Sequence, residues 1–373
     1  MRASRCRVRL EPKRDIPLNH VTSQGSWTSR PSALLHLVSK DGTTGSGELA
    51  PLPGYSVDDF DAGYAALSAL EPLELHPHDF TKPRTLLARI EAMVPRSLPA
   101  ARFALSSAAM DWIGQQAGIS AWELLLHTGE APNEAPVPLC ALLPSGKAKD
   151  RLDEGAALLE AGYRTLKFKL PADLKQATRE LPGLLKLLEQ APGGVGGRLR
   201  LDANQGLPGP KLGSALKALS EFQPELLEEP TTPEAWAEWT SQHEPPIPLA
   251  ADESLFTAPS LAKAWLSARK ASAVVLKPTC LGVARCLDLA DQARSVGVGV
   301  TVSHCFEGPI GFTAVAAVAL AIASRDLPSG LAPPSTLHPK TTRNEGSHPP
   351  FIAAGQLIPW ATSGLDTEFA VRG

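Results

Sequence analysis

The fold is decided by five short stretches, TLKFKL (165–170), LRLDANQ (199–205), LLEEP (226–230), PLAADES (248–254) and AVVLKP (273–278), each of which ends in ionisable side chains. The key residues of the last four stretches are evenly spaced: Asp202, Glu228, Asp252 and Lys277. Each step is about 25 residues, close to the length of one strand, one helix and two loops, since a βαβ unit takes roughly 30 residues. Acids and bases at the C-terminal ends of successive parallel strands are typical of a (β/α) barrel, which the period therefore predicts.

Length and composition bound the possible functions. The 373 residues accommodate one barrel, which takes about 250 residues, and a smaller domain. The net charge of −3 argues against a polyanionic partner, so we expect no nucleic acid. No apolar run reaches the roughly 20 residues that span a bilayer, and none follows the basic start, so we expect no membrane and no secretory signal. The five cysteines are scattered and odd in number, which favours reduced thiols in a cytoplasm.

The N-terminal part of the chain, residues 1–130, differs in pattern from the remainder. Strand patterns at 4–13 and 32–39 flank a polar stretch, and a third strand is expected after the turn at Asp41–Gly42. Helical periodicity then continues to about residue 127. Strands followed by several helices predict a small α+β domain over residues 1–130.

Residues 131–333 alternate strand patterns with helix-period stretches, and this alternation predicts a parallel sheet. The eighth strand, at 329–331, is weak. Residues 334–373 combine a Pro-rich polar loop with a segment, 356–360, that we expect to add a strand to the first domain. The predicted fold class is α/β: a modified (β/α)₇β TIM barrel with an α+β capping domain.

The strand ends bring ionisable side chains to one face. Because side chains alternate along a strand, Lys167 and Lys169 point to the same side. Asp202 likewise shares its side with Arg200 and Asn204. In a barrel strand that side is the interior and its mouth.

Three carboxylates, Asp202, Glu228 and Asp252, would then meet on adjacent strands and repel each other. A hard divalent cation removes the conflict, and Mg²⁺ is the natural choice for oxygen ligands. Lys169 and Lys277 would flank that ion from the strands on either side. This arrangement suits removal of a proton next to a substrate carboxylate, with a lysine as the base and the ion stabilising the enediolate. Each motif alone has an ordinary structural explanation, but five at one period favour a site.

Together, the motifs at 167–169, 202–204, 228–230, 252–254 and 277–278 resemble the muconate-lactonizing subgroup of the enolase superfamily, and most of all the o-succinylbenzoate synthases within it. The resemblance covers nearly the whole chain. Residues 45–56 are similar to the capping-domain loop of these enzymes, and residues 102–111 to the helix before the barrel. Residues 303–308 and 359–365 are similar to the end of the family's fold.

The resemblance implies roles for the residues at the strand ends. Asp202, Glu228 and Asp252 would be ligands of Mg²⁺, with Mn²⁺ as an alternative ion. Lys169 would be the acid and base, Lys167 would tune it, and Lys277 would lie on the opposite face of the substrate. The implied reaction dehydrates 2-succinyl-6-hydroxy-2,4-cyclohexadiene-1-carboxylate to o-succinylbenzoate, a step of menaquinone biosynthesis.

The succinyl tail of that substrate is expected between the cap loops and the last barrel loops. The candidate substrate-binding residues are Arg200, Asn204, Ser303, Glu307, Gly308, Ser26, Trp27 and Gly54. For Arg200, an interior ion pair with a neighbouring glutamate is an equal alternative. Trp27 has the alternative role of an aromatic side chain at the domain interface.

Other functions stay open at this point. An N-succinyl or N-acylamino-acid racemase would use the same ligands with Lys277 as a second acid/base. A dipeptide epimerase is disfavoured because no Asp-x-Asp follows the eighth strand. A Schiff-base aldolase would use Lys277 as its nucleophile, and a catalytically silent barrel is least consistent with the intact set of motifs. The expected partner is a small carboxylate substrate, and the sequence leaves open whether the chain is a monomer or a homo-oligomer.

Overall fold

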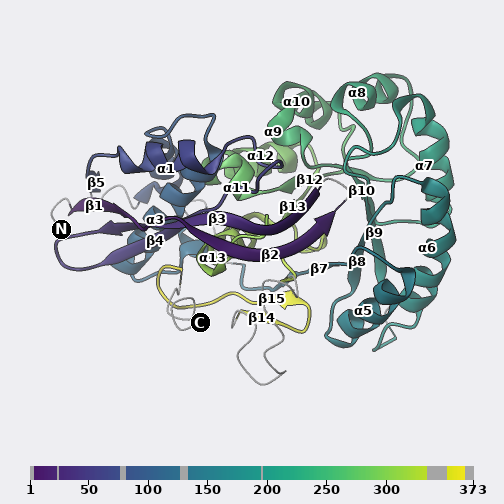
Figure 1. Cartoon of the computed structure of the whole chain (residues 1–373), viewed down its shortest axis with the longest axis horizontal. Helices are drawn as coiled ribbons and strands as arrows, with labels where there is room; N and C mark the ends of the chain where they lie inside the picture. The colour runs from purple at the N-terminus through teal and green to yellow at the C-terminus, as the bar shows by residue number, and fades with distance from the viewer. Residues whose placement is uncertain are drawn as a thin grey trace.

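The structure, a computed structural model, describes residues 4–22, 25–75, 81–126, 133–194, 196–333 and 351–365. The side chains of residues 19–22, 25 and 26 lie outside this description. Figure 1 shows a cap of antiparallel strands and helices on the left and a curved parallel sheet surrounded by helices on the right. The predicted fold class, a (β/α) barrel with an α+β capping domain, is confirmed.

Five strands form the cap sheet: β1 (Ser4–Leu10), β2 (Arg14–Thr22), β3 (Gly25–Val38), β4 (Thr44–Leu49) and β5 (Leu73–Leu75). All of their pairings are antiparallel, and β3 pairs with β1, β2 and β4. The long β2–β3 hairpin extends from the cap towards the barrel strands (Figure 1). Only a polar stretch was predicted before residue 32, and these strands were not predicted. Among the described side chains of the hairpin before Arg30, most are exposed, so no apolar alternation reveals its strands.

The cap helices are α1 (Phe60–Ser68), α2 (Pro83–Glu91), α3 (Pro99–Ala117) and the short α4 (Ala121–Leu124). Helix α3 lies directly against β4, where Gly45 and Gly47 face it. A methyl group on Gly47 would collide with the carbonyl oxygen of Ala104, and one on Gly45 with that of Ala108. The Gly-Ser-Gly motif is therefore a requirement of close strand–helix contact.

The barrel sheet runs in chain order through β7 (Cys140–Leu142), β8 (Thr165–Lys169), β9 (Arg198–Asp202), β10 (Leu226–Glu228), β11 (Leu249–Ala251), β12 (Ala273–Leu276) and β13 (Gly299–Val302), all parallel. The eighth strand position pairs with each neighbouring strand through a single bridge, in agreement with the weak strand pattern at 329–331. Ser329 bridges to Leu139, and Gly330 bridges to Ser303, which closes the sheet.

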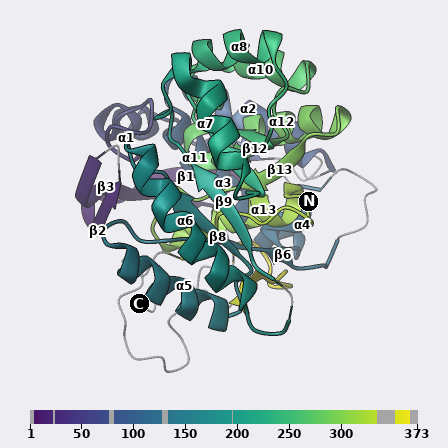
Figure 2. The ribbon, with the colours of Figure 1, turned by 90° about the vertical axis from the view of Figure 1, so that its right-hand side faces the viewer.

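The helices outside the sheet are α5 (Ala148–Glu160), α6 (Leu174–Glu189), α7 (Leu212–Ser220), α8 (Pro233–Gln242), α10 (Pro259–Ser267), α12 (Val283–Ser295) and α13 (Pro309–Ile322). Three short helices follow strand ends: η2 (Gly209–Lys211), α9 (Ser254–Thr257) and α11 (Pro278–Leu281). Figure 2 views α5, α6 and α7 from outside the barrel. Helix α13 is buried along almost its whole length, and no helix in the described ranges is long and apolar enough to cross a membrane.

The C-terminal segment returns differently from the prediction. β15 (Gln356–Leu357) pairs with β14 (Ile352–Ala353) and with β6 (Val137–Pro138), which immediately precedes the first barrel strand in the chain. It does not pair with the cap sheet. The return to the cap comes later in the chain. Gly364 bridges to Ser120, and the backbone N–H of Leu365 donates to Asp111 Oδ1 at 2.9 Å. The predicted polar loop before Phe351 lies outside the described residues.

Two buried carboxylates of the cap hold the N-termini of barrel helices. Glu48 on β4 accepts hydrogen bonds from the backbone N–H of Gly308 at 3.0 Å and of Gly311 at 2.9 Å, at the start of α13. Glu91, at the end of α2, accepts one from Ala284 at 3.1 Å, at the start of α12. Negative charge at a helix N-terminus satisfies donors that the helix leaves unpaired. These contacts orient the cap over the strand ends.

Candidate active site

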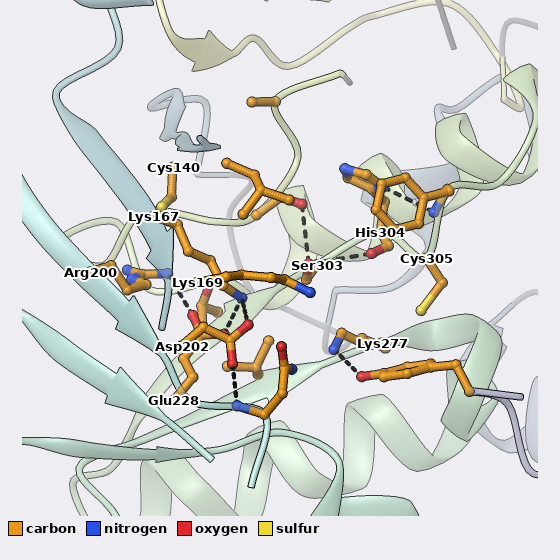
Figure 3. Close-up of a pocket in the computed structure, with 18 of the residues that line it drawn as sticks. Cys140, Lys167, Lys169, Arg200, Asp202, Glu228, Lys277, Ser303, His304 and Cys305 are labelled. Carbon is orange, nitrogen blue, oxygen red and sulfur yellow. Dashed lines mark hydrogen bonds and ion pairs between the residues drawn. The ribbon is translucent and has the colours of Figure 1, made fainter. Parts of the chain in front are cut away.

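A pocket lies at the C-terminal ends of the barrel strands, beneath the cap. Its lining residues are Trp27, Leu52 and Tyr55 from the cap, and Cys140, Leu142, Lys167, Lys169, Arg200, Asp202, Asn204, Glu228, Val275, Lys277, Thr301, Ser303, His304, Cys305, Phe306, Gly330 and Ala332 from the barrel. The parallel register places Lys169 beside Asp202, and Asp202 beside Glu228. The predicted convergence of strand ends is thus present, and Figure 3 shows these side chains pointing into one space.

Lys167 joins two of the carboxylates. Its Nζ lies 2.9 Å from Asp202 Oδ2 and also contacts Glu228 Oε2. Burial alone would lower the pKa of Lys167, but these two carboxylates outweigh it and raise that pKa. Against the effect of burial, Lys167 and Lys169 lower the pKa of Asp202 to about 2. Lys167 is therefore held as a cation between these two carboxylates.

Arg200 lies in an interior ion-pair network. Its Nη2 is 2.9 Å from Glu225 Oε2, and its Nη1 is 3.7 Å from Glu228 Oε1. The side chain is fully buried but still forms part of the pocket wall. Of the two alternatives for Arg200, the structure shows the interior ion pair. Through its Nη1, Arg200 also lies beside the Glu228 carboxylate.

Lys277 reaches the pocket from the end of β12. Its Nζ donates to Asp252 Oδ2 and to the Tyr55 hydroxyl, and it lies 4.8 Å from the centre of the Tyr55 ring. Burial raises the pKa of Asp252 to about 6, although the Lys277 ammonium opposes this. Figure 3 shows Lys277 across the pocket from Lys169.

Lys169 differs from the other two lysines. Within the described part of the chain, its Nζ makes no hydrogen bond or ion pair with another side chain, and it lines the pocket. Burial, reinforced by the positive charges of Lys167 and Lys277, lowers the pKa of Lys169, while Asp202 opposes the shift. Of the three lysines, Lys169 is the one whose pKa is lowered, so its neutral form is the most available of the three.

The carboxylates suit a divalent cation in type and position. As the side chains stand, the described residues contain no group of three His, Cys, Asp or Glu that encloses a metal ion, and lysine ammonium groups contact the oxygens of Asp202, Glu228 and Asp252 instead. Asp252 Oδ1 is buried and has no hydrogen-bond partner in those residues. Three hard oxygen donors on neighbouring strand ends, one of them unpartnered, fit Mg²⁺ once Lys167 and Lys277 withdraw.

Neighbouring residues fix the shape of this cluster. Glu229 accepts from the backbone N–H of Asp252 at 2.7 Å and from the Ser254 hydroxyl, so it supports the end of β11 and does not line the pocket. Asn204 donates through Nδ2 to Glu253 Oε1 at 2.7 Å, and its Oδ1 is buried without a partner in the described ranges. Asn204 therefore keeps one acceptor available in the pocket wall.

The cap supplies one wall of the pocket. Trp27 donates through Nε1 to the Pro53 carbonyl at 2.7 Å, so it ties the hairpin to the 50–56 loop while lining the pocket. Gly54 adopts φ +74 and forms the turn of that loop, but Leu52 and Tyr55 line the pocket in its place. The side chain of Ser26 lies outside the described residues.

The loop after β13 contributes backbone and apolar surface. Ser303 lines the pocket, and its Oγ donates to the Gly330 carbonyl at 3.2 Å. Glu307 instead points into the protein, where it accepts from the Thr279 hydroxyl and from Cys305 N at 2.8 Å. Neither Glu307 nor Gly308 lines the pocket, because each is engaged in anchoring this loop.

Several lining residues were not among the site residues predicted from the sequence. His304 Nδ1 accepts from the backbone N–H of Phe306 at 3.0 Å, and burial lowers the pKa of His304 to about 3, so it is a neutral wall residue. Cys140 and Thr301 face inward from strands that end in no ionisable group. Tyr55 was part of a predicted loop, but its contact with Lys277 depends on how the two domains pack.

Comparison with known proteins adds to this geometry. Residues 151–370 match the family described as enolase C-terminal domain-like, which is more than half of the chain. The chain belongs to the enolase superfamily. Curated relatives include o-succinylbenzoate synthases of Desulfotalea psychrophila (28% identical, 79% of this chain and 84% of that protein) and Thermosynechococcus vestitus (29%, 83% and 86%). A muconate lactonizing enzyme of Pseudomonas fluorescens has the same fold, with a TM-score of 0.81 at 21% identity over 98% and 96% of the two chains.

Other superfamily members match as well. They include a hydrophobic dipeptide epimerase of Enterococcus faecalis, 26% identical, and an N-succinyl-L-Arg/Lys racemase of Bacillus cereus, 23% identical. Solved dipeptide epimerases of Enterococcus faecalis and Methylococcus capsulatus are complexes with Mg and a dipeptide. Membership in the superfamily is therefore shown, while its members carry out more than one reaction.

Proposed function

We propose that this chain is a Mg²⁺-dependent o-succinylbenzoate synthase, a hydro-lyase of menaquinone biosynthesis. The observation that carries the proposal is the position of Lys169 and Lys277 on the two strands that flank the carboxylates Asp202, Glu228 and Asp252. The o-succinylbenzoate synthases among the relatives support the choice of reaction.

The carboxylates of Asp202, Glu228 and Asp252 would hold the ion. When bound, Mg²⁺ would supply positive charge to the substrate carboxylate, and Mn²⁺ is an alternative ion for the same oxygen ligands. The Mg of the two epimerase complexes supports this ligand chemistry. Lys167 and Lys277 would retain their positive charges beside the site after leaving the carboxylate oxygens.

Lys169 would perform both proton transfers. Its neutral Nζ takes the proton from the carbon next to the substrate carboxylate, and the electron pair of that C–H bond stays on the substrate. The same Nζ then gives the proton to the departing hydroxyl, the C–O bond breaks, water leaves and the ring becomes aromatic. The lowered pKa of Lys169 makes its neutral form more available at neutral pH. Lys277 would supply a fixed positive charge against the ring.

An N-succinylamino-acid racemase is the second candidate. The observation that favours it is Lys277, which faces Lys169 across the pocket and would serve as the acid/base on the second face of the substrate. The racemase of Bacillus cereus is a relative that carries out this kind of reaction according to its name. Both candidates use the same carboxylates and the same two lysines.

The test is an absorbance assay for o-succinylbenzoate formed from the cyclohexadiene precursor, with Mg²⁺ and with EDTA. Metal-dependent turnover that Lys169→Ala abolishes, in a variant that remains folded and still binds Mg²⁺, supports the synthase. Failure of folded, metal-loaded protein to turn over would exclude it. Exchange of the α-proton of N-succinyl amino acids in D₂O then tests the racemase, and borohydride trapping of substrate without metal tests for a Schiff base.

We place the reaction in the cytoplasm, with a small carboxylate as the partner molecule. All five cysteines are free and buried, which suits a reducing compartment. Cell fractionation with an antibody against the chain tests this, and recovery in a secreted fraction would contradict it.

A further inference from the structure

The Tyr55 side chain extends from the cap into the pocket and contacts Lys277 of the barrel. Its hydroxyl accepts a hydrogen bond from Lys277 Nζ, and its ring lies 4.8 Å from the same nitrogen. Within the described residues, Nζ also donates to Asp252 Oδ2. The ammonium group of Lys277 is therefore held between one side chain of the barrel and one of the cap.

The Tyr55 hydroxyl is itself held in place. The Tyr55 ring packs edge-on against Phe256 of α9, with ring centres 5.7 Å apart. Its backbone N–H donates to the Leu52 carbonyl at 3.1 Å, and Leu52 N–H donates to the Ser56 hydroxyl at 2.9 Å. The 50–56 loop is thus closed on itself, and these contacts hold the Tyr55 hydroxyl beside Lys277 Nζ.

We propose that Tyr55 is the positioning residue of Lys277, and that it sets where the second lysine stands against the substrate. This inference rests on the proposed function, because it assigns Lys277 a role in the reaction. A lysine has four rotatable bonds, and its Nζ needs fixed partners to stand at one point in the pocket. Asp252 is one partner, but it is also a predicted metal ligand, so Tyr55 is the partner that stays with Lys277 when the ion is bound.

If Tyr55 positions Lys277, its removal should slow proton transfer at the substrate face next to Lys277 more than at the face next to Lys169. Among the described residues, Lys169 Nζ makes no hydrogen bond or ion pair with another side chain, so the Tyr55 hydroxyl influences the Lys169 face only through the charge of Lys277. Reactions that use Lys277 depend on the position of Nζ, since misplacing a catalytic group by about 1 Å costs up to roughly a hundredfold in rate. Removing one hydroxyl should therefore affect one face of the substrate and not the other.

The experiment compares Tyr55→Phe with the wild-type chain loaded with Mg²⁺. Tyr64→Phe is the matched control, because Tyr64 packs on Phe60 within the cap, away from the pocket. Dehydration of the cyclohexadiene substrate gives kcat and KM. Exchange of the α-proton in D₂O is measured on each enantiomer of an N-succinyl amino acid, and Lys169→Met and Lys277→Met identify which lysine serves each enantiomer.

In Tyr55→Phe we expect Lys277-dependent exchange to fall about tenfold while Lys169-dependent exchange stays within about twofold. If the wild-type chain exchanges neither enantiomer but dehydrates, the expected result is a kcat reduced about fivefold with KM unchanged. Equal behaviour of Tyr55→Phe and Tyr64→Phe, or equal loss at both faces, would overturn the positioning role alone. Absence of both reactions in the wild-type chain would overturn the proposed function and the positioning role together.

Discussion

At the barrel mouth the reactive side chains lie at the ends of successive strands, evenly spaced from Asp202 to Lys277, whereas the cap reaches the same pocket through Trp27, Leu52 and Tyr55, which follow no period. The barrel side chains are placed by strand register: pairing of β8, β9 and β10 alone brings Lys169, Asp202 and Glu228 together. The cap side chains are placed by contacts between segments far apart in the chain. Reactive groups thus depend on local structure, and the wall around the substrate depends on tertiary packing.

The largest expected effect is a loss of kcat/KM at Glu228 that should far exceed the loss at its neighbour in the chain, Glu229. Glu228→Gln removes a predicted ligand charge from the pocket, and we expect kcat/KM to fall about a thousandfold. Folding should be retained, because Lys167 keeps Asp202 and Arg200 keeps Glu225 as partners. Steady-state kinetics and circular dichroism measure the two effects.

Glu229→Gln is the matched control for that substitution. Its side chain supports Asp252 N and Ser254 from outside the pocket, so we expect a loss of about tenfold, as for groups that orient metal ligands. Similar losses of kcat/KM in both variants would show that strand register does not decide which of the two carboxylates takes part in the reaction.

The next effect concerns Gly47, which lies within the cap between β4 and α3. Gly47→Ala forces a methyl group into the Ala104 carbonyl, and we expect the free energy of unfolding to fall by about 3 kcal/mol. Gly196→Ala is the control, because nothing lies within 4 Å of its added methyl group. Urea denaturation of both variants measures the difference, and an unchanged midpoint for Gly47→Ala would contradict the close contact of β4 and α3.

These cases show what the sequence can predict. The five strand ends were predictable because each strand is marked by a short apolar run and a βα period, and strand register then aligns the ends. The β2–β3 hairpin was not, because its sequence before Arg30 is mostly polar and most of its described side chains there are exposed. Glu307 was assigned to the substrate because it follows β13, but only tertiary packing reveals that Thr279 and Cys305 hold it in the interior.

A smaller effect is expected where the cap holds the loop after β13. Glu48→Gln removes the negative charge at the start of α13 and one of two acceptors, so we expect the free energy of unfolding to fall by about 2 kcal/mol. Because that loop forms part of the pocket wall, KM should rise more than kcat falls. Glu74→Gln on the exposed face of β5 is the matched control. A change in kcat alone would show that the cap acts on the chemistry and not on substrate binding.

An effect of similar size is a pH dependence of stability within the cap, at a residue that does not line the pocket. Asp58 is buried and accepts from Ala100 N at 2.9 Å, and burial raises the pKa of Asp58 to about 6. The folded chain therefore binds a proton more tightly than the unfolded chain, so this group makes the free energy of unfolding decrease as pH rises from about 4 to about 6. The decrease should be about 2 kcal/mol and complete above that range.

Asp58→Asn cannot ionise, yet its side-chain oxygen can still accept from Ala100. We expect the variant to lack this decrease, so that its stability relative to the wild-type chain improves by about 2 kcal/mol between pH 4 and pH 7. Urea denaturation across that range measures the difference, in which the other titrating groups cancel. Parallel curves for the two proteins would show that Asp58 ionises in the folded cap as it does in water. The pH dependence of kcat should be the same in both, because the cap positions the pocket wall while the strand ends carry the proton transfers.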